Sequence, residues 1–395
     1  MASYKIPFNR PSIVGREFEF LQDAIHRGQL SGDGHYTRMC NERLEQITGS
    51  AAALLTHSCT AALEMAAILC DLEPGDEVIM PSFTFVSTAN AVVLRGATPV
   101  FVDLDTETLN LDPTSVRAAV TSRTKAIFAV HYAGFPADID ALADIARTHN
   151  LLLVEDAAQA LGSTYKGRLA GSLGDMAAFS FHETKNIISG EGGALTLNRP
   201  ELVERAEIIR EKGTNRSRFV RGEVDKYTWV DIGSSFLPGE LVAAFLYAQL
   251  EQADVIRARR MALYNRYMEA FSELADAGRV VLPKTPKDTT GNGHMFYLLL
   301  KDRRDRDAMI AHMTSSGINA VFHYVPLHSS PAGRKFGHCN GSLAATDDIS
   351  SRLVRLPMFF ALDTQIETVI STARSYLTTV EHISLPKRDS RKKSV

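Results

Sequence analysis

Short apolar runs that alternate with helical patterns over residues 50–200 constrain the fold of this chain most. Seven such runs occur, at residues 52–56, 77–80, 99–103, 125–131, 151–156, 176–181 and 194–197. Most are continuously apolar rather than alternating, which indicates strands buried on both faces. Residues 58–70 and 137–149 have helical spacing, and the second stretch follows Pro136. The pattern predicts an α/β domain with a mostly parallel sheet between helices.

The pattern changes after Gly233 and predicts a second unit. Residues 238–274 have the spacing of a long helical stretch without a strand-like interruption. A smaller α/β unit is predicted beyond it, with strands at residues 295–300 and 319–324 and helices near residues 305–315, 348–353 and 365–378. We expect a large domain over residues 1–240 and a small C-terminal domain over residues 241–384. Residues 385–395 contain five Lys or Arg and one Asp, and we expect a disordered basic tail there.

Composition excludes several classes of protein. The 395 residues are 45% hydrophobic and 23% charged, and the net charge of −3 lacks the basic excess of proteins that coat nucleic acids. The four cysteines form no CxxC pair, and Asp103 and Asp105 lack the remaining spacing of a calcium loop, so no metal site is expected. No secretory signal is visible and no apolar run reaches the ~18–20 residues of a membrane span, so we expect a cytoplasmic protein.

Several polar side chains follow the predicted strands directly. Ligands of open parallel sheets bind outside the carboxyl ends of the strands, so these side chains are candidates for a site. Ser58, Cys59 and Thr60 open a helix, where they either bind phosphate or cap the helix. Asp156 ends a strand, where it either caps the next segment or faces a cationic partner such as a protonated pyridine.

Lys185 lies between a buried strand and the glycine cluster at residues 190–193. It is either partly desolvated, which lowers its pKa and favours Schiff-base chemistry, or a solvated loop lysine. A hydrolase triad of Ser82 or Ser180 with His131 is disfavoured, because no G-x-S-x-G elbow surrounds either serine. The single Trp229 either stacks on a base or sugar or is buried.

Together these segments resemble the sugar-nucleotide aminotransferases, which are pyridoxal-phosphate enzymes of fold type I. The resemblance extends over nearly the whole chain except the basic tail. Its ordered blocks are residues 58–63 (SCTAAL), 75–85 (GDEVIMPSFTF), 154–159 (VEDAAQ), 179–186 (FSFHETKN) and 190–193 (GEGG). It implies a large domain with a mostly parallel sheet between helices, a smaller C-terminal α/β domain and pyridoxal 5′-phosphate as cofactor. It also implies a homodimer in which residues 214–235 complete the partner's active site.

The resemblance also implies roles for single residues. Lys185 forms the Schiff base with the cofactor and carries the proton during transfer, and Asp156 pairs with the pyridine nitrogen. The other implied cofactor contacts are Cys59, Thr60 and Ser180 at the phosphate, Phe85 and Gln159 at the ring, and Ser235 at the phosphate of the partner's cofactor. Many relatives have Gly at Cys59, where a backbone donor survives, and Asn at Ser235, where the shorter side chain makes the contact water-mediated or absent. Trp229, His323 and Tyr324 are placed near the sugar by position alone.

Further stretches resemble the family members that act at C4 of dTDP-4-keto-6-deoxyglucose. They are residues 208–217 (IIREKGTNRS), 225–229 (DKYTW), 232–235 (IGSS) and 321–328 (VFHYVPLH). The implied reaction takes the amino group from L-glutamate and gives dTDP-4-amino-4,6-dideoxygalactose for surface polysaccharides such as enterobacterial common antigen. The alternatives are a transaminase for another nucleotide-linked keto-sugar (C3, or a gluco-configured C4 product) and a non-catalytic sugar-nucleotide-binding or regulatory protein. Lys185 favours transamination, because family members that act as dehydratases have His at this position.

Overall fold

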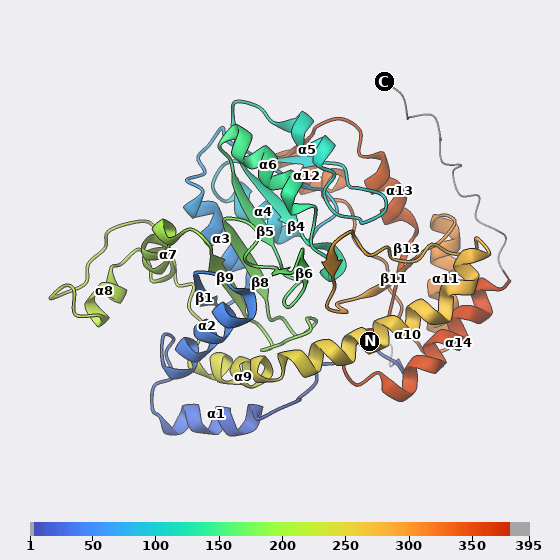
Figure 1. Ribbon diagram of the computed structural model, residues 1–395, viewed down its shortest axis with the longest axis horizontal. Coiled ribbons are helices and arrows are strands. Elements are labelled where there is room, and N and C mark those ends of the chain that lie inside the picture. The colour runs from blue at the N-terminus through green and yellow to red at the C-terminus, as the bar shows by residue number, and fades with distance from the viewer. Residues whose placement is uncertain (1–3, 380–395) are drawn as a thin grey trace.

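The computed structural model describes residues 4–379, and its centre is an eight-stranded sheet (Figure 1). The strand order is β1-β9-β8-β5-β4-β2-β3-β12, and all neighbours are parallel except that β9 runs antiparallel to β1 and β8. The strands are β1 (Ala52–Thr56), β2 (Glu77–Pro81), β3 (Thr98–Val102), β4 (Thr124–Val130), β5 (Leu152–Asp156), β8 (Met176–Ser180), β9 (Gly193–Leu197) and β12 (His338–Cys339). The mostly parallel sheet is confirmed, and every predicted run over residues 50–200 is a strand within one residue at each end. The tail predicted at residues 385–395 lies outside the described residues.

Helices cover both faces of this sheet, as continuously apolar strands require. Along β2, Val78 and Met80 belong to one buried cluster and Ile79 to another. The first cluster includes α3 (Cys59–Leu69), α4 (Val86–Val93) and α7 (Val203–Arg210), and the second includes α2 (His35–Thr48), α5 (Pro113–Ala119), α6 (Ile139–His149) and α9 (Glu240–Glu251). Side chains in the middle of the sheet therefore pack in the two buried clusters. Polar side chains that could bind a ligand are expected at the strand ends.

A second core surrounds β11 (Phe296–Leu299) and β13 (Leu353–Leu356), which form an antiparallel pair. Its helices are α10 (Ala253–Asp276), α11 (Arg303–Ser315), α13 (Ala344–Arg352) and α14 (Ile366–Leu377). The first described residues join this core, since Ile6 is buried in it and bridges Ile318. The domain limits at residues 240 and 384 stay predictions. Within residues 4–379, every helix is too short or too polar to cross a membrane.

Two details differ from the sequence pattern. The helical stretch at residues 238–274 consists of α9 and α10, which meet at Gln252, where the backbone leaves helical geometry (φ −98°, ψ 12°). The strand predicted at residues 319–324 is wrong, since the segment forms no ladder and Val321 makes only a single bridge, with Arg355. Phe322 in this segment is 48% exposed, so the segment lacks the two buried faces of a core strand. The second core instead uses β13, which the sequence pattern did not indicate.

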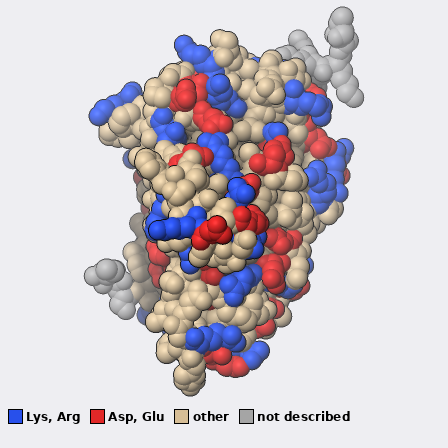
Figure 2. Space-filling view, turned by 90° about the vertical axis from the view of Figure 1, so that its left-hand side faces the viewer, with Lys and Arg blue, Asp and Glu red and all other residues tan. Residues whose placement is uncertain are grey.

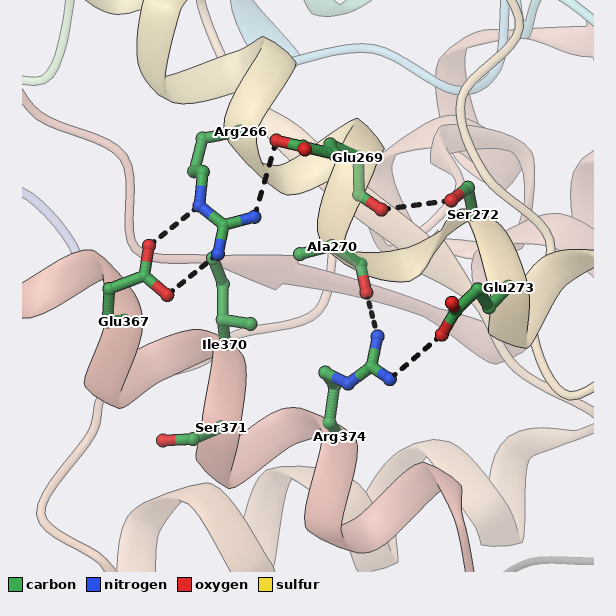
Figure 3. A pocket seen from close by; sticks show the side chains of 9 residues that line it. All are labelled: Arg266, Glu269, Ala270, Ser272, Glu273, Glu367, Ile370, Ser371 and Arg374. Carbon is green, nitrogen blue, oxygen red and sulfur yellow. Dashed lines mark hydrogen bonds and ion pairs between the residues drawn. The ribbon is translucent and has the colours of Figure 1, made fainter.

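Ion pairs join α10 to α14 on the outside of the second core (Figure 3). Arg266 pairs with Glu367 (Nε–Oε1 2.7 Å) and with Glu269, and Arg374 pairs with Glu273. Exposed pairs of this kind contribute about 0–1 kcal/mol each, so the apolar contacts beneath them hold the two helices together. The open hollow between the helices, about 640 Å³, is lined by these charges, which are all paired with one another.

A buried carboxylate ties α9 to the start of α2. Glu240 is 2% exposed, and its side-chain oxygens accept hydrogen bonds from the backbone N–H groups of Gly34 (3.1 Å), Tyr36 (2.7 Å) and Thr37 (3.0 Å). The first N–H groups of a helix lack partners within the helix and favour a nearby negative charge. Since Gly34 is the N-cap of α2 and has no side chain, Glu240 takes over the capping.

We expect Glu240→Ala to lower the free energy of unfolding by about 3 kcal/mol or more, because three N–H groups lose their acceptor in a buried place. The midpoint of thermal unfolding, followed by circular dichroism, should fall by several degrees. Glu251→Ala is the matched control, because Glu251 ends the same helix and is exposed. Equal midpoints for the two variants would contradict the capping role of Glu240.

Candidate active site

A cavity of about 540 Å³ lies at the carboxyl ends of β5 and β8 and is closed by residues of the second core. It gathers most of the site residues that the sequence singled out: Cys59, Thr60, Phe85, Asp156, Gln159, Ser180, Lys185, His323 and Tyr324. Ser235 and Trp229 lie outside this cavity, on the exposed segment between α8 (Arg216–Val220) and α9. Residues that are more than 250 positions apart in the chain thus meet at one edge of the sheet.

One end of the cavity is the N-terminus of α3. Ser58 caps this helix with its hydroxyl, so the capping alternative holds for this residue. Cys59 and Thr60 lie in the first turn and line the cavity, and the Thr60 hydroxyl is 2.7 Å from the Ser87 hydroxyl. Gly193 on β9 permits the close approach, because a Cβ there would lie 2.3 Å from the Ser58 backbone. Free N–H groups and hydroxyls at a helix start suit a phosphate.

Asp156, the last residue of β5, is a buried carboxylate with neutral partners. It is 5% exposed, its Oδ2 accepts a hydrogen bond from the Thr88 hydroxyl (2.7 Å), and its Oδ1 accepts one from the Ala158 N–H (3.3 Å). The Thr88 hydroxyl is in turn 2.9 Å from that of Thr84. Within residues 4–379, no Lys, Arg or His forms an ion pair with Asp156. These contacts orient the carboxylate and leave it able to bind a cationic ligand group.

Lys185 lies in the turn that follows β8, and its side chain lines the cavity. Burial lowers the pKa of Lys185, because low polarity disfavours the charged ammonium. Cys59 and Asp156 act against this shift, whereas the positive charge of Arg355 adds to it. The side chain has no hydrogen-bond or ion-pair partner in the described part of the chain. A partly buried amine that is readily neutral can act as a nucleophile and a base.

Gln159, His323 and Tyr324 line the cavity as polar groups with hydrogen-bond partners. Gln159 accepts a hydrogen bond from the Ala133 N–H (2.8 Å) through Oε1, and its Nε2 donates to the Tyr324 hydroxyl (3.2 Å). The Tyr132 hydroxyl lies 3.1 Å from Nδ1 of His323. Burial lowers the pKa of His323 well below its usual value, so this imidazole is neutral near pH 7. These residues thus offer uncharged hydrogen-bonding groups to the cavity, which suit the hydroxyls of a sugar.

Sequence reasoning missed several residues of the site. Arg355, His294 and Phe8 line the cavity, and Thr88 orients Asp156. The one available signal was the charged Arg355 within the apolar stretch of residues 353–356. The other three belong to no recognisable motif, and only the fold brings them to the site.

The structure also separates residues that were considered as a hydrolase triad. Ser82 is buried and lies 2.7 Å from Nδ1 of His328, and His131 is buried against Glu155 (2.9 Å). Ser180 lies in the cavity instead. His131 therefore contacts neither Ser82 nor Ser180, and the hydrolase triad is not formed.

The lowered pKa of Lys185 predicts its reactivity in the cofactor-free protein. Reductive methylation needs the neutral amine, so its rate at Lys185 should reach half-maximum below the usual lysine pKa of about 10.4. Lys166 is the internal control, because its hydrogen bond with Asp140 raises its pKa. The rates are measured residue by residue by mass spectrometry of peptides. Methylation of both lysines with the same pH profile would contradict the prediction.

The sequence matches known proteins over most of its length. The profile of the DegT/DnrJ/EryC1/StrS aminotransferase family matches residues 11–374. The spore coat polysaccharide biosynthesis protein SpsC of Bacillus subtilis is 33% identical over 381 residues, which cover 93% of this chain and 96% of SpsC.

Solved structures agree with this match. The aminotransferase TlmJ from Streptoalloteichus hindustanus has a TM-score of 0.85 and 31% identity, over 96% of this chain and 99% of that chain. The PLP form of the putative sugar aminotransferase Spr1654 from Streptococcus pneumoniae has a TM-score of 0.85 and 26% identity, over 95% of this chain and 99% of that chain. The predicted fold class and cofactor are thereby confirmed. The chain belongs to the DegT/DnrJ/EryC1/StrS family of pyridoxal-phosphate-dependent sugar aminotransferases.

Proposed function

We propose that this family member is a dTDP-4-amino-4,6-dideoxygalactose transaminase. It would move an amino group from L-glutamate to C4 of dTDP-4-keto-6-deoxy-D-glucose, and the product would serve surface polysaccharides such as enterobacterial common antigen. The observation that carries the catalytic part is that Lys185, which has no hydrogen-bond or ion-pair partner within residues 4–379, shares one cavity with the buried Asp156. The choice of acceptor rests on the resemblance of residues 208–217 and 321–328.

The cavity fits pyridoxal phosphate. We assign the phosphate to the N-terminus of α3, beside Cys59, Thr60 and Ser180, because free N–H groups there favour a dianion. Among the described residues Asp156 has only neutral hydrogen-bond partners, and we assign it to the protonated ring nitrogen. The remaining assigned contacts, at the faces and edge of the ring, are Phe85 and Gln159.

The chain's own residues supply the proton chemistry. Bound pyridoxal phosphate acts as an electron sink that stabilises negative charge on the carbon beside the amine. Neutral Lys185 would take the proton from the donor's α-carbon and, in the second half-reaction, deliver a proton to C4 of the sugar. Burial favours this neutral form by lowering the pKa of Lys185. Asp156 would keep the ring nitrogen protonated, since a nearby carboxylate raises the pKa of that nitrogen.

Two alternatives stand beside this proposal. A transaminase for another nucleotide-linked keto-sugar, acting at C3 or giving a gluco-configured C4 product, would use the same cofactor contacts. A non-catalytic sugar-nucleotide-binding protein is disfavoured by the presence of Lys185, Asp156 and Gln159 in one cavity. The cytoplasmic location and the lack of a nucleic-acid partner stay predictions.

We also propose a homodimer with shared active sites. Residues 214–235, which include α8, project from the body of the fold (Figure 1). Trp229 is 80% exposed and Val220 is 65% exposed on this segment. Figure 2 faces this side, where acidic and basic side chains are interspersed among uncharged ones. A second copy of the chain would cover the apolar side chains and receive Ser235 and Trp229 beside its own cavity.

The visible spectrum of the purified holoenzyme tests the reaction. L-Glutamate should remove the absorption band of the lysine-bound cofactor, and dTDP-4-keto-6-deoxyglucose should restore it and yield the galacto-configured 4-amino sugar, identified by NMR. If glutamate removes the band and this sugar does not restore it, the acceptor is a different keto-sugar. If no band forms even with added pyridoxal phosphate, the transaminase proposal fails.

Lys185→Ala gives the matching control for that experiment. We expect turnover to fall by at least about 1,000-fold, because the variant loses both the Schiff base and the proton carrier. The thermal unfolding midpoint of the cofactor-free protein should change little, because Lys185 bonds to no described residue through its side chain. Lys166→Ala removes an exposed lysine and should keep full turnover.

We expect Trp229→Ser to weaken the dimer, because it removes the most exposed large apolar side chain of the projecting segment. Analytical ultracentrifugation over a range of protein concentrations measures the dissociation constant. Phe336→Ser, which changes another exposed aromatic residue outside this segment, is the control and should leave the constant unchanged. A monomeric wild-type protein would contradict the shared-site arrangement.

A further inference from the structure

The turn that carries Lys185 is tied to the segment before β11 through the side chain of Asn186. Its Nδ2 donates a hydrogen bond to the carbonyl oxygen of Asn292 (3.0 Å), and its Oδ1 lies 3.1 Å from Nδ1 of His294. The bond to a carbonyl oxygen fixes the orientation of the amide, because only its NH₂ end can donate. His294 therefore meets the oxygen end of Asn186.

This contact determines which ring nitrogen of His294 carries the hydrogen. An amide oxygen can only accept a hydrogen bond, so Nδ1 must be the N–H donor. Burial lowers the pKa of His294 well below its usual value, and nearby positive charges act in the same direction, so the ring is neutral near pH 7. A neutral imidazole has a single N–H, and Nε2 is therefore a hydrogen-bond acceptor with a free lone pair.

Nε2 is the polar atom that His294 offers to the cavity. The residue is only 6% exposed and lines the cavity together with Lys185. Among residues 4–379, Nε2 has no hydrogen-bond partner, yet it does not belong to the side-chain atoms that are fully enclosed without one. Its remaining accessible surface therefore faces the cavity, where it can accept a hydrogen bond.

Most groups assigned to this cavity cannot donate to Nε2. The phosphate dianion of the cofactor and the carboxylates of an amino donor are acceptors, and the protonated ring nitrogen is assigned to Asp156. The remaining donors are the amine of Lys185 and the hydroxyls of the sugar. Of the positive charges that lower the pKa of His294, that of Lys185 has the largest effect, ahead of Arg260 and Arg355. This proximity favours Lys185 as the donor.

Proton transfer creates a charge that needs such an acceptor. When Lys185 takes a proton from the substrate, it becomes an ammonium group in a cavity where no residue of the described chain bonds to its side chain. An unpaired ammonium group in a buried place is costly. The lysine stem of four carbons is flexible, so the amine, once free of the cofactor, can turn toward a neighbouring side chain.

We propose that Nε2 of His294 accepts a hydrogen bond from the ammonium group of Lys185 and so positions this group for proton delivery. The assignment rests on the proposed function, since it assumes that Lys185 is the proton carrier. His294 holds the charge without taking the proton, because its own ring stays neutral near pH 7. It is thus a positioning residue, and it acts in both half-reactions, since Lys185 carries a proton in each.

Reductive methylation of the cofactor-free protein tests the contact itself. The contact stabilises the charged amine, so His294→Leu should lower the pKa of Lys185 further and enlarge its neutral fraction. At a fixed pH below the wild-type half-maximum, the rate at Lys185 should rise about tenfold, as expected when one hydrogen bond to a charged group is lost. His294→Gln returns an acceptor oxygen and should bring the rate back toward wild type. His312→Leu is the control, because the His312 ring lies 3.1 Å from the Ser375 hydroxyl, outside the cavity.

Single turnovers of the holoenzyme test the role of His294 in the reaction. In His294→Leu the rate constants of both half-reactions should fall by a similar factor of about tenfold, with little change in the substrate concentrations that give half the maximal rate. Deuterium at the α-carbon of L-glutamate should slow the variant more than wild type, because proton transfer then limits the turnover more strongly. His294→Gln should recover part of both rates.

Two results would overturn the proposal. One is an unchanged methylation rate at Lys185 in His294→Leu. The other is a loss confined to the sugar half-reaction, because Nε2 would then serve a sugar hydroxyl. Asn186→Leu replaces His294→Leu if that variant does not fold, since it frees the ring to adopt the other tautomer and should move both measurements in the same direction. Wild-type protein that forms no lysine-bound cofactor band would refute the proposed function, whereas methylation of the cofactor-free protein would still decide on the contact.

Discussion

Burial of both faces of the central sheet determines where the functional side chains can lie. Neighbouring residues such as Val78 and Ile79 point into opposite apolar clusters, so no catalytic group projects from the middle of a strand. Polar groups buried among apolar atoms are costly unless bonded. The functional side chains therefore stand where strands end, as Asp156 does on β5 and Ser180 on β8. Lys185 follows one turn later at the same edge.

Within residues 4–379, three ionisable groups of the cavity lack an ion-pair partner of opposite charge. Asp156 is held by neutral donors, Lys185 is shifted toward its neutral form, and no carboxylate of the described residues pairs with Arg355. Each condition matches one property of the expected ligands. A protonated ring suits Asp156, a carbonyl suits a neutral amine, and a carboxylate suits a guanidinium. The ionisable groups that lack partners in the cavity thus indicate which chemical groups its ligands carry.

The sequence predicted the parts of this arrangement that leave a local pattern. Strands buried on both faces give unbroken apolar runs, so their ends were predicted within one residue. The strand prediction at residues 319–324 was wrong, because the side chains there do not alternate between a core and solvent. Phe322 is exposed to solvent, whereas His323 lines the cavity. Arg355 was missed for a different reason. A single arginine in an apolar strand forms no motif, and only the fold shows that it lines the cavity and that no carboxylate within residues 4–379 pairs with it.

The large unit also determines where Arg355 stands. Asp103, which the sequence offered only as a poor metal ligand, accepts hydrogen bonds from the N–H groups of Ala345 (3.0 Å) and Thr346 (2.9 Å). It thereby caps α13, which runs directly into β13. One carboxylate at the end of β3 thus fixes the start of the helix that delivers Arg355 to the cavity of Lys185. Because Arg355 lines the cavity of Lys185, the shape of that cavity depends on the docking of the second core as much as on the sheet.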